Sequence, residues 1–465
     1  MSARSTDVTP LVDSDEQRRR IKATDLVEAF FARIAAVNDS ANALIRLLED
    51  QAYADAQQVD QQRAIGEPLP LDGLPMVVKD NIDVRGVVSA SGSLLLKNRA
   101  AERDASVVRR LRRAGAVVLA KAHCTELMFS MRAHPELPFC TNPWDHDRIP
   151  GASSSGSGAA LALDECVAAL GTDTGGSVRL PATFCGVSAL RPTYGTVSSR
   201  GVFPIARSFD TVGPMARSVA DVAAVFTAVV GYDKADSRSV REEPEPEPVE
   251  VPVDLRQVRI GISRDFFFEN LDPEVAAAVE RAIEHLAQQG AAIEEIHLPG
   301  IEQARQNFIT FHLAEALSLH RDALKRTPEL FSDYVRERLQ WATRVTGADL
   351  ADAVEGMHKW RRQVEAVFDG GVDALLSPTA PCLPPLVAEA QLGRHLDITR
   401  LTYPLSFARV PILCVPCGAS QDGLSIGMEL AAAPYRDRYL LRIGATYQMT
   451  TKWHQRRPPQ FHAVS

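Results

Sequence analysis

Short apolar runs alternate with amphipathic segments along this chain, and that alternation restricts its fold more than any other feature. A helical pattern over 106–114 precedes the apolar run 116–120. The same order recurs at 274–290 and 291–297, after a further strand-like run at 258–262. Apolar residues spaced three to four apart indicate helices, whereas short apolar runs rich in β-branched residues indicate buried strands. The alternation predicts an α/β protein.

The N-terminal third places a polar pair at the end of a predicted strand. Apolar residues at helical spacing predict an amphipathic helix over 24–37, and the apolar run 74–78 predicts a buried strand. Lys79 and Asp80 follow that run directly, so they fall where a strand meets a loop. A strand end is a position where chemistry can be held in place.

Two other stretches break the alternation. The segment 303–370 is almost wholly helical and is expected to form a helical insertion, either capping a site or forming a plain surface layer. The acidic, proline-rich residues Glu242–Pro248 cannot pack a core, so 236–256 is expected to be an exposed surface loop. Strand-like runs at 372–376 and 410–415 return the chain to the sheet.

Composition excludes several classes of function. The formal net charge of −8, from 51 basic and 59 acidic residues, argues against direct nucleic-acid binding. No window approaches the roughly eighteen apolar residues of a membrane span. The seven cysteines are scattered and odd in number, which predicts free thiols in a reducing compartment. The first 20 residues are polar and lack a secretory signal, so we expect a cytoplasmic protein.

The centre of the chain carries two serine-bearing glycine loops, Gly151–Gly158 and Gly171–Arg179. A serine hydroxyl is a poor nucleophile at neutral pH and needs a neighbouring base and donors for the oxyanion. Lys79 is a candidate base. Each motif also has a simpler interpretation by itself. Gly151–Gly158 is typical of a flexible linker, Gly171–Arg179 of a glycine turn with a capping serine, and Lys79 of an ion-paired lysine.

Ser177 is expected at a loop-to-helix junction, because Pro181 is tolerated only in the first turn of a helix. The backbone amides of Thr174, Gly175, Gly176 and Ser177 are then candidates for a concave nest of donors. Glycine permits that backbone and lets a substrate approach closely.

A lysine base requires an unusual environment. Lowering its pKa from about 10.4 to near 7 takes roughly 4 to 5 kcal/mol of preference for the neutral form. Burial of Lys79 at a strand end among hydroxyl groups is expected to supply that preference.

Taken together, these segments resemble the amidase signature family. The similarity is specific in the centre and weaker elsewhere, reaching 404–416, and it rests on these segments: Leu74–Asp80, Gly151–Gly158, Gly171–Val187, Leu190–Gly195 and Ser208–Pro214. The resemblance implies one domain over 1–465, with an α/β fold in which a large mixed β-sheet is flanked by helices on both faces.

The family's Ser-Ser-Lys triad falls on Ser177 as nucleophile, Ser153 as bridging serine and Lys79 as base. The two serines are 24 residues apart, the family's usual separation. In the family the bridging serine follows a cis peptide, here Ala152–Ser153, where alanine replaces the commoner glycine. The resemblance implies an acyl-enzyme on Ser177 and a proton relay through Ser153 to Lys79.

Further positions match the family less specifically. Those expected to orient the loops are Ser154, Asp173 and Arg179. Those similar to pocket-lining positions in relatives with apolar substrates are Met128, Phe129 and Ser130, although a core-packing role for Met128 and Phe129 stays equally open.

The predicted activity is hydrolysis of the carbon–nitrogen bond of a small-molecule amide, with aryl or hydrophobic amides, carbamates (a urethanase activity) and esters all open. We expect no cofactor and no metal, since the eleven histidines form no His-Glu-x-x-His pattern. A homodimer stays open. One alternative is the glutaminase subunit of a tRNA-dependent amidotransferase, although 305–370 does not resemble that subunit's substrate-binding segment. Another is a catalytically silent binding protein of the same fold.

Overall fold

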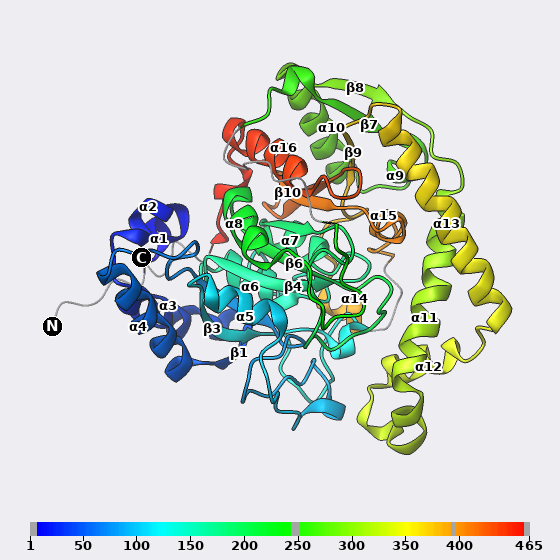
Figure 1. Ribbon diagram of the computed structural model, residues 1–465. Coiled ribbons are helices and arrows are strands. Elements are labelled where there is room, and N and C mark those ends of the chain that lie inside the picture. Colours follow the sequence, from blue (N-terminus) through cyan, green and yellow to red (C-terminus); the bar gives the residue numbers. More distant parts are fainter. Residues whose placement is uncertain (1–6, 243–251, 392–396, 460–465) are drawn as a thin grey trace.

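One mixed sheet organises the computed structural model, which describes residues 7–242, 252–391 and 397–459. Its eleven strands lie in the order β1-β3-β2-β4-β6-β5-β10-β11-β9-β7-β8 (Figure 1). The strands are β1 Leu44–Leu47, β2 Pro75–Lys79, β3 Val117–Ala122, β4 Ala168–Asp173, β5 Ser188–Arg191, β6 Thr211–Ala216, β7 Arg259–Ile262, β8 Ala292–Glu295, β9 Ala374–Pro378, β10 Ile412–Ala419 and β11 Ser425–Ala431.

Strand direction changes across the sheet. β3, β2 and β4 are parallel, as are β9, β7 and β8, whereas the central run from β4 through β6, β5, β10 and β11 to β9 is antiparallel. Because β2 and β4 are parallel, their carboxyl ends meet at one edge of the sheet. That edge brings Lys79, the last residue of β2, close to the end of β4.

Helices cover both faces of this sheet, as Figure 1 shows. Within the described residues the α-helices are α1 Thr9–Asp13, α2 Asp15–Arg19, α3 Ala23–Ala41, α4 Glu49–Ala64, α5 Ser106–Arg113, α6 Ser155–Ala162, α7 Arg179–Cys185, α8 Val219–Val229, α9 Arg264–Phe267, α10 Pro273–Gln288, α11 Ile301–Arg326, α12 Asp333–Ala342, α13 Gly347–Asp369, α14 Val387–Gln391, α15 Thr402–Ala408 and α16 Asp437–Thr450. Short 3₁₀ turns are η1 Leu94–Leu96, η2 Glu126–Met128, η3 Leu255–Gln257, η4 Pro328–Leu330 and η5 Trp453–Gln455.

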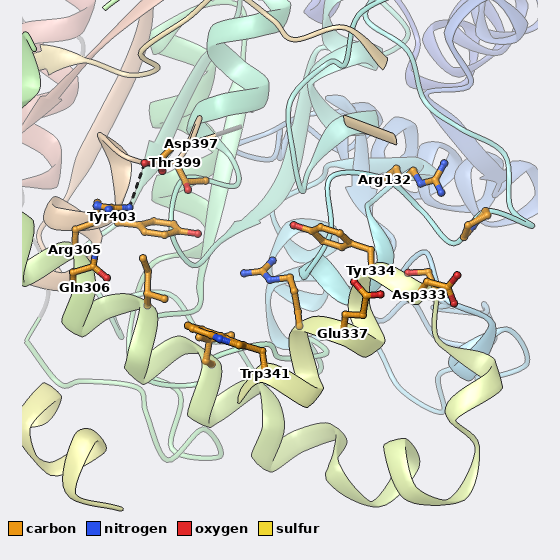
Figure 2. A pocket seen from close by; sticks show the side chains of 15 residues that line it. Arg132, Arg305, Gln306, Asp333, Tyr334, Glu337, Trp341, Asp397, Thr399 and Tyr403 are labelled. Carbon is orange, nitrogen blue, oxygen red and sulfur yellow. Dashed lines mark hydrogen bonds and ion pairs between the residues drawn. The ribbon is translucent and has the colours of Figure 1, made fainter. Parts of the chain in front are cut away.

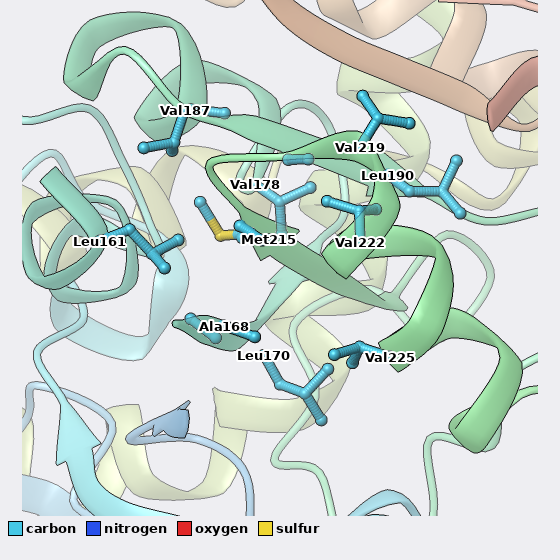
Figure 3. Close-up of a cluster of buried hydrophobic side chains, with 14 of the residues drawn as sticks. Leu161, Ala168, Leu170, Val178, Val187, Leu190, Met215, Val219, Val222 and Val225 are labelled. Atoms are coloured by element: carbon cyan, nitrogen blue, oxygen red, sulfur yellow. The ribbon is translucent and has the colours of Figure 1, made fainter. Parts of the chain in front are cut away.

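The main core lies where α6 and α8 pack against the central strands. Figure 3 shows Leu161 of α6 and Val222 of α8 on either side of Met215, which belongs to β6. Every residue of β4 and β6 is buried. Strands covered on both faces explain why these runs are apolar throughout and do not alternate.

The predicted fold class is confirmed. The helices expected over 24–37, 106–114 and 274–290 are α3, α5 and α10, and the helical segment 303–370 is formed by α11, α12 and α13. Sequence analysis did not identify β11 and α16. In the predicted acidic loop, residues 243–251 lie outside the described residues.

Gly156 lets α6 approach the end of β3. A β-carbon there would collide with the backbones of Ala43 and His123, whereas one at Gly347, at the start of α13, would meet nothing within 4 Å. Both glycines are helical and neither has a positive φ.

We therefore expect Gly156→Ala to lower the free energy of unfolding by about 1–3 kcal/mol or more, the usual cost of overpacking. Gly347→Ala is the control and should be neutral or stabilising by up to about 1 kcal/mol, because alanine favours helix. Chemical denaturation of both variants measures the difference, and equal midpoints would contradict the close approach.

Candidate active site

Lys79 is buried at the end of β2 among hydroxyl and carbonyl oxygens. Its Nζ donates to Ser153 Oγ at 2.7 Å, to Thr172 Oγ1 at 2.8 Å and to the Thr172 carbonyl at 3.3 Å. The side chain is fully buried, and among the described residues no carboxylate forms an ion pair with it. Uncharged oxygens therefore hold the amine.

Burial lowers the pKa of Lys79 to about 8, against the opposing effect of the acidic groups of Cys124, Asp173 and Asp210. Desolvation disfavours the charged ammonium form. Above pH 8 the neutral amine predominates and its lone pair faces a hydroxyl 2.7 Å away. This geometry suits a proton acceptor.

The Ser153–Ser154 loop is fastened to the neighbouring loops. The Ala152–Ser153 peptide is cis, as predicted. Ser154 Oγ donates to the Thr172 carbonyl at 3.2 Å, and the Ser154 amide donates to the Ser177 carbonyl at 3.1 Å. The glycine-rich segment is therefore held against the end of β4 where it enters α6, and the flexible-linker interpretation is wrong.

Ser177 stands two residues before α7, at the predicted junction, with Pro181 as the third residue of that helix. Ser177 and Ser153 line one cavity. Lys79 and Ser153 are hydrogen-bonded, but no hydrogen bond within the described part of the chain joins the side chains of Ser153 and Ser177. Catalytic contacts of this kind often tighten only when substrate binds.

One predicted oxyanion donor is already occupied. The Gly176 amide donates to Asp173 Oδ1 at 2.8 Å, and its place in the donor nest stays a prediction. The amides of Thr174, Gly175 and Ser177 have no acceptor among the described residues. Three candidate donors remain.

Asp173 holds the loop that carries Ser177 in place. Its carboxylate accepts from Arg179 Nε at 3.1 Å and from Arg191 Nη1 at 3.0 Å, and all three side chains are fully buried. Burial would raise the pKa of Asp173, but the two guanidinium groups outweigh burial and hold it well below its usual range. Arg179 also pairs with Glu429 at 2.9 Å, and burial raises the pKa of Glu429 to about 7.

Other loop contacts come from distant segments. Thr174 Oγ1 donates to Asp210 Oδ1 at 2.6 Å, and Thr402 Oγ1 donates to the Gly175 carbonyl at 2.6 Å. A β-carbon on Gly175 would lie 2.6 Å from Tyr403, so only glycine fits. Sequence analysis missed these partners, although Asp210 lay within a motif it had singled out.

The cavity around Ser177 has a mixed wall, formed by Met128, Phe129, Ser130, Met131, Ala152, Ser153, Thr174, Gly175, Ile205, His312, Arg338, Thr399 and Tyr403. Met128, Phe129 and Ser130 are each less than 9% exposed, so they line the cavity and pack in the core as well. A pocket-lining role and a core-packing role for Met128 and Phe129 are therefore compatible.

A wider hollow adjoins this cavity and shares Arg338, Thr399 and Tyr403 with it. Figure 2 shows its wall, with Trp341 and Tyr334 on α12 and the Arg305–Asp397 ion pair of 3.3 Å. Because α11 and α12 build much of the wall of the wider hollow and contribute His312 and Arg338 to the cavity, the 303–370 segment lies against the candidate site.

The described residues hold no group of three or more His, Cys, Asp or Glu side chains that could bind a metal. None of the helices in 7–242, 252–391 and 397–459 is long and apolar enough to cross a membrane. All seven cysteines are free thiols, and six of them are buried.

Comparison with known proteins identifies the family. The family described as Amidase matches residues 25–441. The chain belongs to the amidase family. Its membership confirms the predicted resemblance and makes the protein a hydrolase of that family.

Relatives of this amidase include enzymes with different names. The Glutamyl-tRNA(Gln) amidotransferase A-subunit of Chloroflexus aggregans is 37% identical over 94% of this chain and 95% of its own length. A structure solved from a vestigial protein complex, reported to reveal the origins of an s-triazine catabolic enzyme, has a TM-score of 0.85 and 34% identity over 93% of this chain and 96% of that one. The structure of 6-aminohexanoate cyclic dimer hydrolase has a TM-score of 0.85 and 28% identity, over 97% of this chain and 98% of that one.

The buried charges predict a large effect of Asp173→Asn on stability. Loss of this carboxylate leaves Arg191 without an ion-pair partner among the described residues, and breaking one side of a buried network typically costs about 3–5 kcal/mol. Asp254→Asn is the control, because Asp254 pairs with Arg256 at the surface and its loss should leave the denaturation midpoint unchanged. Equal midpoints for the two variants, measured in urea, would contradict the role given to Asp173.

Proposed function

We propose that this amidase hydrolyses small-molecule amides through an acyl-enzyme on Ser177, with Ser153 and Lys79 as the proton relay. The observation that carries the proposal is the 2.7 Å hydrogen bond between Lys79 Nζ and Ser153 Oγ, beside a cavity that both serines line. A buried amine with a depressed pKa, bonded to a hydroxyl, is a suitable general base.

The order of the proton transfers follows from these contacts. Neutral Lys79 takes the proton of Ser153, Ser153 takes the proton of Ser177, and Ser177 Oγ attacks the amide carbonyl. The relay then runs in reverse, so that the leaving nitrogen receives a proton as the carbon–nitrogen bond breaks. Water repeats the sequence on the ester and releases the acid, which restores Ser177.

The developing oxyanion needs donors that are already in place. The amides of Thr174, Gly175 and Ser177 are proposed for this role, because they have no acceptor of their own among the described residues. Asp173 is proposed to position them, since it holds the Gly176 amide and both arginines beneath the loop. Arg179 acts through its ion pair with Asp173, and Ser154 acts through its hydrogen bonds to the Thr172 and Ser177 carbonyls.

The cavity supports a substrate that is partly apolar. Met128, Phe129 and Ile205 supply hydrocarbon and aromatic surface, and Arg338 supplies a charge at the mouth shared with the wider hollow. We propose that 303–370 covers the cavity, because His312 of α11 and Arg338 of α12 form part of its wall. Aryl amides, carbamates and esters all remain candidate substrates.

A second candidate function is that of one subunit in an amidotransferase, working beside partner chains. The observation that favours it is the near full-length identity of 37% to 38% with A-subunits of proteins named Glutamyl-tRNA(Gln) amidotransferase. A panel of glutamine, anilides, carbamates and esters given to the purified chain separates the two. Turnover of the small amides alone supports the first function, and ammonia release from glutamine only with partner subunits supports the second.

Ser177→Ala should reduce amide turnover by at least about 10⁴-fold, since it removes the nucleophile. A fluorophosphonate should label wild-type protein at Ser177 and leave the variant unlabelled. Ser199→Ala is the control, because Ser199 lies outside the cavity and should keep full activity. An unlabelled but folded wild-type protein would support a catalytically silent chain, and retained turnover in Ser177→Ala would refute the nucleophile.

A further inference from the structure

Asp210 is a partly buried carboxylate close to the cavity that the proposed mechanism does not use. It directly precedes β6, and the first residue of β6, Thr211, pairs with Asp173 at the end of β4. Asp210 therefore stands at the sheet edge from which the Ser177 loop starts. Unlike Asp173, it forms no ion pair with a lysine or arginine of the described residues.

The Asp210 carboxylate joins two parts of the cavity wall. Its Oδ1 accepts a hydrogen bond from Thr174 Oγ1 at 2.6 Å, and its Oδ2 accepts one from the Ile205 amide at 2.9 Å. The Ala206 amide donates to both oxygens at 3.2 Å. Thr174 and Ile205 line the cavity and belong to different segments of the chain. One side chain therefore holds the loop before Ser177 at a fixed distance from the 205–206 segment.

These contacts suit an ionised carboxylate, because every partner is a donor. An ionised aspartate only accepts hydrogen bonds, whereas protonation turns one of its oxygens into a donor. Hydrogen bonds from a hydroxyl to an ionised carboxylate are short, at roughly 2.5–2.7 Å, and stronger than those between neutral groups. The contact with the Thr174 hydroxyl has that length. Protonation of Asp210 therefore weakens its hold on the loop.

The surroundings of Asp210 bring its protonation within the range of ordinary buffers. Removal from water raises the pKa of Asp210 to about 6 against the effect of its hydrogen bonds, and the charge of Glu315 on α11 acts in the same direction as burial. Further titratable groups close to it are Lys79, Arg191 and Tyr194. The carboxylate is therefore ionised at neutral pH, and its contacts weaken as the pH falls through about 6.

We propose that Asp210 is a positioning residue whose ionised carboxylate holds Thr174 of the donor loop against the Ile205 part of the cavity wall. Asp210 does not line the cavity itself and acts through the Thr174 amide, one of the proposed oxyanion donors. The inference rests on the proposed function, because it takes that amide as an oxyanion donor. Such donors must be in place before charge develops, so a loosened Thr174 slows the attack of Ser177.

Asp437 offers a matched control. This buried carboxylate accepts a hydrogen bond from the Thr193 hydroxyl at 2.7 Å and another from the Thr193 amide at 2.8 Å. Burial raises the pKa of Asp437 to about 6 as well. Neither Asp437 nor Thr193 lines the cavity. A purely structural role for carboxylates bound to a threonine would therefore affect Asp210 and Asp437 alike.

The test measures the rate at which a fluorophosphonate labels Ser177 from about pH 5 to about pH 9. In the wild-type protein, the logarithm of the rate should rise with a slope of one from about pH 6 to about pH 8, where the neutral Lys79 amine forms. Below about pH 6 the slope should be two, because Asp210 must also lose its proton.

Asp210→Asn should abolish this break in slope. Its rate at pH 8 should fall about ten- to a hundredfold, somewhat less than the loss caused by removing an oxyanion donor outright. Asp437→Asn should keep the break, and its rate at pH 8 should stay within about twofold of wild type. Circular dichroism at each pH shows whether each protein is folded when it is labelled.

Thr174→Val gives a second readout that a folding defect does not reproduce. The variant removes the hydroxyl, whose hydrogen bond is the strongest of the effects that lower the pKa of Asp210. The break should therefore move to higher pH. Thr174→Ser keeps a hydroxyl and should return the break to about pH 6.

A break that Asp210→Asn removes and Asp437→Asn retains supports the proposal. The same break in wild type and Asp210→Asn would assign it to another group, such as Glu429, whose pKa burial raises to about 7, and would overturn the proposal. A single slope in wild type, equal loss of the break in Asp437→Asn, or an unmoved break in Thr174→Val would overturn it as well. A folded wild-type protein that is not labelled at any pH would contradict the proposed function, and this inference with it.

Discussion

The burial of the Lys79 amine among uncharged oxygens is the constraint on which the rest of this site depends. A charged ammonium in that position would lose its hydration and gain only hydroxyl and carbonyl acceptors from Ser153 and Thr172. The protein environment therefore favours the neutral amine, which is the form that a serine nucleophile needs. The parallel pairing of β2 with β4 fixes this arrangement, because it brings Lys79 to the same edge as Thr172.

The carboxylate of Asp173, unlike the Lys79 amine, is buried in its charged form. Asp173 is equally buried, but two arginines surround it and keep it ionised. Its position at the end of β4 puts a fixed anion under the loop that carries Ser177. Thr172, which accepts hydrogen bonds from the Lys79 amine, directly precedes Asp173 in the chain. A neutral base, Lys79, and a charged positioning group, Asp173, therefore lie at the same edge of the sheet.

Sequence patterns predicted many of the local elements, because strand ends and glycine loops have local signatures. That Lys79, Ser153 and Ser177 form one site was implied by the resemblance to the amidase signature family. They did not predict Arg191, Glu429 or Thr402 as partners of the loop, since these contacts join segments far apart in the chain. The contact of the Gly176 amide with Asp173 was not predicted for a related reason, because a motif shows which amides exist and not which acceptor each one meets. The polar wall from α11 and α12 likewise depends on how the helical insertion packs.

A direct titration of Lys79 tests the central claim. Lysines labelled with ¹³C at Cε can be followed by NMR from about pH 6 to about pH 11, a range that brackets both the lowered and the ordinary lysine pKa. Lys79 is assigned from the resonance that Lys79→Met removes, which is necessary because burial also lowers the pKa of Lys121 to about 8. The account predicts a pKa for Lys79 of about 8, as burial sets it. An ammonium at Lys79 that stays protonated above about pH 10, as an ordinary lysine does, would contradict the account.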